Sequence, residues 1–267
     1  MTSDPIIQDR EGAVVRVTLN RPHVLNSLDL AMMDALAPLL DQLAGDETVR
    51  AVILTGAGAH FMAGGDLRFF KENFLTLEGE ARKAVFRELI GRLHQGIVTI
   101  ARMEKPVIAQ VQGSAAGAGL SLMLACDLAI ASADSRFTAA YEKIGTTPDG
   151  GLTFALPRVV GARKAMEIAM LGETLNAEEA LALGLVNKVV PPEALAEETL
   201  KIAQRLAAGA ARSSAGCKRL IRASFEHDLE TQLALERESF AECTLTPDFE
   251  EGITAFTEKR TPRFGKA

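Results

Sequence analysis

Two glycine-rich turns constrain this chain more than any other feature, because each lies between a strand-like and a helix-like segment. The first turn spans residues 56–66 and follows the short apolar run Ala51–Thr55. The second spans residues 113–119 and follows Pro106–Val111. Small residues let a ligand approach the backbone closely, and a helix that begins there offers N–H groups without intrahelical partners. Placed side by side, the two turns would present two N–H donors to a single oxyanion.

Glycine is also common in strand-to-helix turns for purely structural reasons, so the pattern alone leaves both interpretations open. Neither turn fits the G-x-G-x-x-G dinucleotide pattern with an acidic residue at the required distance, and the chain contains no G-x-x-x-x-G-K-[ST] motif. Nucleotide binding is therefore a weaker interpretation of these turns than an oxyanion site.

Strand-like and helix-like segments alternate along the N-terminal half of the chain. Strands are predicted over Ala13–Leu19 and Asp127–Ser132, besides the two that precede the glycine-rich turns. Helices are predicted from Ser27, a candidate N-cap, to near Gly45, and from about Ala81 to Met103. Residues 70–80 are polar and ambiguous, and we interpret them as a candidate mobile lid. The alternation predicts an α/β fold with a parallel sheet covered on both faces.

The pattern becomes helical in the C-terminal part of the chain. Helices are predicted over residues 161–171, 177–183, 193–208 and 212–242. We therefore expect an α/β core over residues 1–190, followed by a helical C-terminal region over residues 191–267.

Charge, cysteine content and hydropathy exclude several classes of partner. A net charge of −6 argues against nucleic-acid binding, which requires clustered Lys and Arg. Three unpaired-looking cysteines fit reduced thiols, and the histidines lack partners at metal-ligand spacing. Polar residues interrupt the longest apolar stretch, 106–132, and the N-terminal residues do not resemble a signal peptide. We expect a cytoplasmic protein with no metal site, nucleic-acid partner or membrane partner.

Several motifs in order along nearly the whole chain resemble the crotonase (enoyl-CoA hydratase/isomerase) superfamily. They are Asn20-Arg21-Pro22 with Asn26-Ser27-Leu28, AVILTGAGAHFMAGGDL, KPVIAQVQGSAAGAGLSLMLACDLAIAS, FTAAYEKIGTTPDGG, LPRVVG, AMEIAMLGETLNAEEALALGLVNKVVP and DFEEGITAFTEKRTPRF. Each piece is weakly specific alone, but their order and spacing together are highly specific. In character the chain is most similar to 1,2-epoxyphenylacetyl-CoA isomerase-like members.

The resemblance implies a spiral of ββα units with a helical C-terminal trimerisation region, hence a homotrimer or a hexamer. It also implies an acyl-CoA substrate from fatty acid or aromatic acid degradation, with coenzyme A entering as part of the substrate and no tightly bound cofactor. Carried over by position, the oxyanion donors are the backbone N–H groups of Gly65 and Ala118. The implied contacts to substrate or coenzyme A are Leu25, Ala63, Gly64, Asp66 and Leu67, with Phe256 and Lys259 reaching a neighbouring subunit.

The resemblance also bears on which reaction the site performs. The two glutamates with which the family's hydratases hold water are replaced by Ser121 and Tyr141, which we expect to shape the substrate pocket. Glu142 adjoins the second position, and only a local bulge would bring it there. Asp149 matches the aspartate of the isomerase-like members, so we predict that it shuttles the proton. Pro-Asp-Gly is also a common plain turn.

The leading hypothesis is an acyl-CoA isomerase in which Gly65 and Ala118 hold the enolate oxygen and Asp149 moves the proton. One alternative is an enoyl-CoA hydratase, a lyase that uses Asp149 alone. Another is a hydrolase or dehalogenase acting on aryl thioesters, in which His94 works with Asp149. A protein of the same fold that binds coenzyme A without turnover is the fourth possibility.

Overall fold

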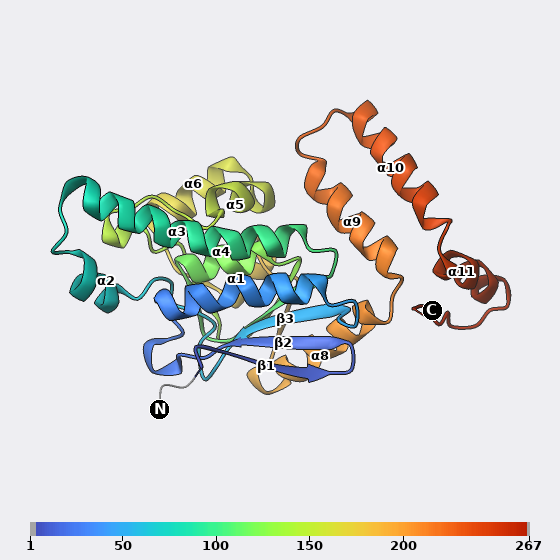
Figure 1. The fold of residues 1–267 in the computed structure, drawn as a ribbon, viewed down its shortest axis with the longest axis horizontal. Coiled ribbons are helices and arrows are strands. Elements are labelled where there is room, and N and C mark those ends of the chain that lie inside the picture. The colour runs from blue at the N-terminus through green and yellow to red at the C-terminus, as the bar shows by residue number, and fades with distance from the viewer. Residues whose placement is uncertain (1–3, 266–267) are drawn as a thin grey trace.

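The computed structural model describes residues 4–265, and its framework is a six-stranded sheet in the order β1-β2-β3-β4-β6-β9 (Figure 1). The strands are β1 (Ile6–Glu11), β2 (Val14–Leu19), β3 (Ala51–Gly56), β4 (Val107–Val111), β6 (Leu128–Ser132) and β9 (Lys188–Val190). All neighbours pair in parallel except β1, which runs antiparallel to β2. The sequence did not indicate β1, because this edge strand is largely exposed and polar and lacks the apolar alternation of a buried strand.

A second, three-stranded sheet has the order β5-β7-β8, formed by β5 (Ser114–Ala116), β7 (Arg136–Thr138) and β8 (Leu175–Asn176). Along the chain, β4 is followed by β5 and β6 by β7, so each of these turns adds one strand to each sheet. An isolated parallel bridge between Met62 and Ala115 adds the first glycine-rich turn beside β5. The chain therefore climbs as a spiral, which confirms the predicted α/β architecture.

Helices cover both faces of the main sheet, as the sequence predicted. The helices α1 (Leu30–Gly45) and α3 (Gly79–Arg102) pack together over one face, where Val52 and Leu54 of β3 are fully buried. The alternate β3 residues, Ala51 and Ile53, join a separate apolar cluster on the other face with α8 (Leu195–Ala207). The division expected at residue 190 coincides with the end of β9, although α8, which follows it, still packs on the sheet.

One expectation in the N-terminal half requires correction, and one ambiguous segment becomes defined. Helix α1 is capped by Asp29, whose Oδ1 accepts from the Met32 N–H at 2.9 Å, and not by Ser27. The chain stays extended until then because Leu28 forms a parallel bridge with Gly65. The segment interpreted as a lid contains most of helix α2 (Leu67–Phe74), which Asp66 caps by accepting from the Phe69 N–H.

The remaining helices are α4 (Ala118–Ala125), α5 (Leu152–Val160), α6 (Ala162–Leu171), α7 (Ala177–Ala182), α9 (Ala211–Ala223), α10 (Leu229–Cys243) and α11 (Pro247–Thr257). Of these, α5 and α11 were not indicated by the sequence. The single helix expected over residues 212–242 is two helices, because the chain turns after α9 and Asp228 caps α10 by accepting from the Thr231 N–H. Within residues 4–265, no helix combines the length and the apolar character needed to cross a bilayer.

Helices α9, α10 and α11 form an arm that stands apart from the sheet at one end of the molecule (Figure 1). The base of this C-terminal arm is held by Asp127, which precedes β6. Its carboxylate accepts from Lys218 at 2.8 Å and from Arg222 at 2.9 Å, and both cations belong to α9. Lys218 Nζ also donates to the carbonyl oxygen of Ile100 at 2.7 Å, so α9 is tied to two separate parts of the core.

Candidate active site

The spiral places the two glycine-rich turns in direct contact. The Met62 N–H donates to the Ser114 carbonyl at 3.0 Å, and the Ala116 N–H donates to the Met62 carbonyl at 2.9 Å. A Cβ atom added to Gly64 would lie 3.4 Å from the backbone nitrogen of Ala118. The backbone around residues 64–65 therefore lies beside the start of α4.

Two backbone N–H groups at this contact, those of Gly65 and Ala118, have no hydrogen-bond partner among residues 4–265. The Leu28 N–H donates to the carbonyl of Gly64, and the Leu28 carbonyl accepts from the N–H of Asp66. In this parallel pairing the N–H of Gly65, the residue between them, points away from Leu28. Ala118 is the first residue of α4, where N–H groups lack intrahelical acceptors. These free donors on adjacent turns suit an anionic oxygen.

Two polar side chains fix the first glycine-rich turn, and sequence reasoning gave neither a role. The fully buried amide of Asn26 donates from Nδ2 to the carbonyls of Ala57 and His60, at 2.9 and 2.7 Å. His60 Nδ1 accepts from the Ser114 N–H at 3.1 Å, which links the first turn to the second. Both side chains contact residues that are far from them in the sequence, so hydrophobic periodicity could not predict these hydrogen bonds.

The side chain of Asp66 serves structure at the end of the same turn. In addition to capping α2, its carboxylate accepts from Arg21 at 3.0 Å, and Arg21 also pairs with Asp29 at 3.1 Å. The buried ion pair joins the caps of α1 and α2 to the Asn20-Arg21-Pro22 motif. Of the residues predicted to contact the substrate, Asp66 has its side chain and both backbone groups engaged within the fold, whereas the side chains of Leu25 and Leu67 are exposed.

Asp149, Tyr141 and Ser121 form one hydrogen-bonded cluster. The Tyr141 hydroxyl lies 2.6 Å from Asp149 Oδ1 and 2.9 Å from Ser121 Oγ. Ser121 Oγ also donates to the backbone carbonyl of Asp149 at 3.0 Å. Burial, followed by the negative charge of Asp149, raises the pKa of Tyr141 well above its ordinary value. The phenol thus stays protonated and donates to the carboxylate.

Glu142, the residue that a one-position shift would bring to the second hydratase position, points elsewhere. Its carboxylate packs against the backbone of Gly172, so closely that a Cβ atom added there would overlap it. Tyr141, and not Glu142, is the residue beside Ser121 and Asp149, as the unbroken register predicted.

His94 lies next to this cluster without contacting the Asp149 carboxylate. Its Nε2 atom accepts from the Gly150 N–H at 3.2 Å, and the side chain is otherwise exposed. Because Nε2 is the acceptor, the bond requires the neutral imidazole with its proton on Nδ1. His94 thus supports the turn that carries Asp149 in this structure.

Aromatic rings border the first glycine-rich turn at Gly65. The ring of Phe70 lies against Gly65, where an added Cβ atom would come within 2.6 Å of it. Phe86 of α3 meets Phe70 edge-on, with ring centroids 5.2 Å apart, and Phe74 lies 5.7 Å from Phe86. Phe69 and Phe74 also pack edge-on at 5.3 Å. These four phenylalanines of α2 and α3 form one aromatic cluster beside the first glycine-rich turn.

Phe256 and Lys259 are not near these residues within one chain. Phe256 lies on α11 and Lys259 follows that helix, in the C-terminal arm, while α2 lies at the opposite end of the molecule (Figure 1). The Phe256 side chain is 84% exposed. Any contact of these two residues with a thioester site therefore requires a second copy of the chain.

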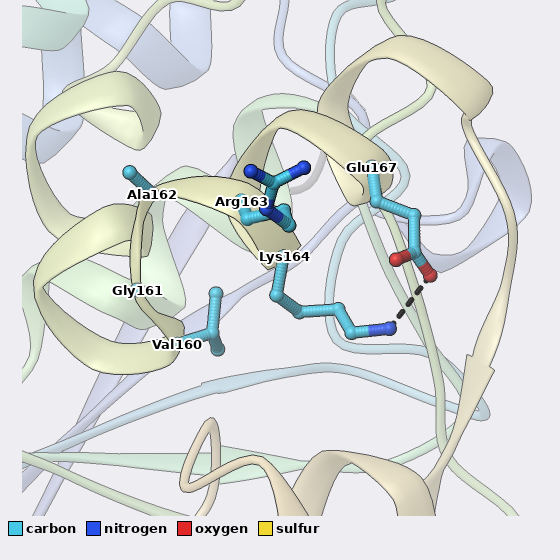
Figure 2. A pocket seen from close by; sticks show the side chains of 6 residues that line it. All are labelled: Val160, Gly161, Ala162, Arg163, Lys164 and Glu167. Atoms are coloured by element: carbon cyan, nitrogen blue, oxygen red, sulfur yellow. Dashed lines mark hydrogen bonds and ion pairs between the residues drawn. The ribbon is translucent and has the colours of Figure 1, made fainter.

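Two surface hollows lie elsewhere, and no residue predicted for the site lines either of them. One, of about 390 Å³, lies at the junction of α5 and α6, where Lys164 reaches toward Glu167 to form an ion pair of 2.6 Å (Figure 2). The other, of about 430 Å³, lies where the segments before β3 and β4 meet the start of α9. Because neither hollow includes a residue predicted for the site, the candidate site remains at the contact of the two turns.

Comparison with known proteins gives a consistent result over almost the full length. A family described as enoyl-CoA hydratase/isomerase matches residues 9–267. The chain is 38% identical to 1,2-epoxyphenylacetyl-CoA isomerase of Escherichia coli and 37% identical to short-chain-enoyl-CoA hydratase of Clostridium acetobutylicum, covering 97% of both chains in each case. A crystal structure of an enoyl-CoA hydratase from Polaromonas sp. JS666 superposes with a TM-score of 0.91 at 37% identity, covering 97% of this chain and 98% of that one.

Proposed function

The chain belongs to the enoyl-CoA hydratase/isomerase family, and from this premise we propose that it is an acyl-CoA isomerase. The substrate is an enoyl thioester of coenzyme A, or a thioester with a strained ring that opens. Coenzyme A enters and leaves with the substrate, and no tightly bound cofactor takes part. The cytoplasmic location expected from the sequence stays a prediction.

In the proposed reaction, one carboxylate moves one proton between two carbons of the acyl chain. Asp149 removes a proton from an activated carbon, and the electron pair delocalises onto the thioester oxygen as an enolate. The N–H groups of Gly65 and Ala118 donate to that oxygen. Asp149 then returns the proton to the other end of the delocalised system, so the double bond moves and no water is consumed.

The observation that carries this proposal is the composition of the cluster that includes Ser121 of α4, the helix that begins at Ala118. Asp149 is its single carboxylate among residues 4–265, and its partners are the hydroxyl groups of Ser121 and Tyr141. Water addition with two glutamates needs one carboxylate to hold water and another to exchange its proton, whereas moving a proton between carbons needs only one.

Enoyl-CoA hydration is the second candidate, and the likeness to the Clostridium acetobutylicum hydratase favours it. It would require Asp149 alone to activate water. The two activities leave different products, since a hydratase forms a 3-hydroxyacyl thioester and an isomerase forms none.

A direct assay separates these candidates. Purified protein is given 3-enoyl-CoA and 2-enoyl-CoA in separate reactions, and the products are resolved by liquid chromatography and mass spectrometry. We expect interconversion of the double-bond isomers without a mass increase, because one carboxylate suffices for this transfer. Hydration of 2-enoyl-CoA faster than migration would refute the isomerase assignment. Binding of coenzyme A thioesters without any turnover would favour a non-catalytic protein.

We also propose that the protein is a homotrimer, or a hexamer of two trimers, assembled through the C-terminal arm. The support is the apolar surface of this arm, since large side chains exposed over half of their area are costly to leave in water. They include Ile221, Phe225, Leu229, Leu233, Phe240, Leu245, Ile253 and Phe256. In such an assembly Phe256 and Lys259 of one subunit would reach the coenzyme A of another.

Light scattering coupled to size-exclusion chromatography tests the assembly. We expect three or six times the chain mass of 28.5 kDa for the wild type. Phe240→Glu places a charge on the exposed face of α10 and should yield smaller species, whereas Ile7→Glu, on the exposed side of edge strand β1, should not change the mass. A wild-type monomer at micromolar concentration would disprove the proposal.

A further inference from the structure

Tyr141 makes closer contact with the proposed base than any other described side chain does. Its hydroxyl has one proton, the residue is 7% exposed, and the acceptor at 2.6 Å is Asp149 Oδ1. An ionised carboxylate has no proton to give, so the phenol must be the donor. Charge-assisted hydrogen bonds of this length are among the stronger ones in proteins.

We propose that Tyr141 is a positioning residue that occupies Oδ1 of Asp149 and leaves Oδ2 as the one oxygen that exchanges protons with the substrate. This inference rests on the proposed function and assigns Tyr141 a role that the sequence did not indicate. Rotation of the carboxylate that interchanges Oδ1 and Oδ2 would break the hydrogen bond from Tyr141. The same oxygen therefore both removes and returns the proton.

Ser121 connects this arrangement to the oxyanion donors. It is 1% exposed and lies three residues after Ala118 in α4, so one helical turn separates the two. Its hydroxyl reaches both the Tyr141 oxygen and the carbonyl of Asp149. One rigid, buried helix thus sets the distance between the N–H group at Ala118 and the carboxylate.

Close packing restricts the turn that carries Asp149. Gly150 has a φ of +60°, and a Cβ atom added there would come within 2.8 Å of Ser121 Cβ. The Gly150 N–H is held by His94 at 3.2 Å, while the Asp149 carbonyl is held by Ser121 at 3.0 Å. Both bonds hold the peptide group that joins Asp149 to Gly150, and the bond from Tyr141 holds the Asp149 carboxylate.

The variant Tyr141→Phe tests the kinetic consequence, because it keeps the ring and removes the donor. We expect kcat for double-bond migration to fall about 10- to 100-fold, as for loss of a hydrogen bond to a charged group, with KM unchanged. Ser135→Ala, which removes another buried hydroxyl donating to the Val111 carbonyl at 3.0 Å, is the matched control. It should leave kcat and KM unchanged.

An optical measurement tests the contact without turnover. The chain has one Tyr and no Trp, so its tyrosine fluorescence reports Tyr141 alone. A phenol hydrogen-bonded to a carboxylate is quenched, because the excited phenol passes its proton to that acceptor. We expect weak emission from the wild type at neutral pH. Asp149→Asn should emit strongly at the same pH, because it removes the carboxylate acceptor.

The two readouts separate the possible failures. If the fluorescence behaves as expected but the wild type moves no double bonds, the proposed function fails and the contact stands. If migration depends on Asp149 while Tyr141→Phe keeps the wild-type kcat, Tyr141 has no positioning role. Equal emission from the wild type and Asp149→Asn would also overturn the inference.

Discussion

Replacing Asp149 by asparagine should reduce the rate of double-bond migration by a factor of about 10² to 10⁴, the usual contribution of a positioned general acid or base. Asparagine has nearly the same shape, and its carbonyl oxygen can still accept from the Tyr141 hydroxyl, which lies 2.6 Å from Oδ1 in the wild type. It cannot take a proton from carbon at neutral pH. Substrate binding and folding should therefore change little, and the loss should fall on kcat.

The measurement is a progress curve with 3-enoyl-CoA, together with chemical denaturation of the same variant. Asp9→Asn is a suitable control, because this carboxylate lies on edge strand β1 with its side chain 60% exposed. The control should keep wild-type activity. If Asp149→Asn retains more than about a tenth of the wild-type rate, the loss is smaller than a general acid or base contributes, and Asp149 has no such role.

The second large effect is expected from Gly119→Ala, a substitution that ordinarily stabilises a helix. At this position the new Cβ atom would lie 2.2 Å from the carbonyl oxygen of Met62 and 2.9 Å from its carbonyl carbon. Both atoms are backbone, so the clash cannot be relieved by turning a side chain. Either α4 or the first glycine-rich turn must move, which would separate the N–H groups of Gly65 and Ala118.

We expect the free energy of unfolding to fall by about 3 kcal/mol, at the upper end for an overpacked core. Migration should slow as well, because misplacing an oxyanion donor alone costs about 100-fold or more. Gly91→Ala in α3 is the matched control, since nothing lies within 4 Å of its Cβ position. That variant should be more stable than the wild type by up to about 1 kcal/mol. If the two variants unfold at the same denaturant concentration, the close approach of the turns is wrong.

The general architecture could be predicted because it depends on local patterns. Buried strands such as Ala51–Gly56 are continuous apolar runs, and the glycine-rich turns follow them directly. Parallel strands place such turns at one edge of the sheet, so their proximity follows from the order of elements. Strand β1 was missed for the same physical reason, because its exposed residues show no apolar alternation.

The hydrogen bonds of the site could not be predicted in the same way. Tyr141 and Ser121 were identified as occupants of the hydratase positions, but which atoms they contact depends on side-chain rotamers and on the path of residues 145–150. The hydrogen bonds of the Asn26, His60 and Arg21 side chains join residues that are 34 to 54 positions apart in the sequence. Local sequence patterns cannot predict contacts over such separations. The break between α9 and α10 is easier to predict from the sequence, because Asp228 directly before a helical segment is a typical N-cap.

The firm attachment of the base of the C-terminal arm affects how quickly copies of the chain could associate. Lys218 is almost fully enclosed and is held at once by the Asp127 carboxylate and by the carbonyls of Ile100 and Lys105. Asp127 in turn accepts from the N–H of Val107, the first residue of β4. The direction in which the apolar helices project is thus determined when the sheet folds. Encounter between copies can then proceed as rigid-body docking, without an ordering step to slow it.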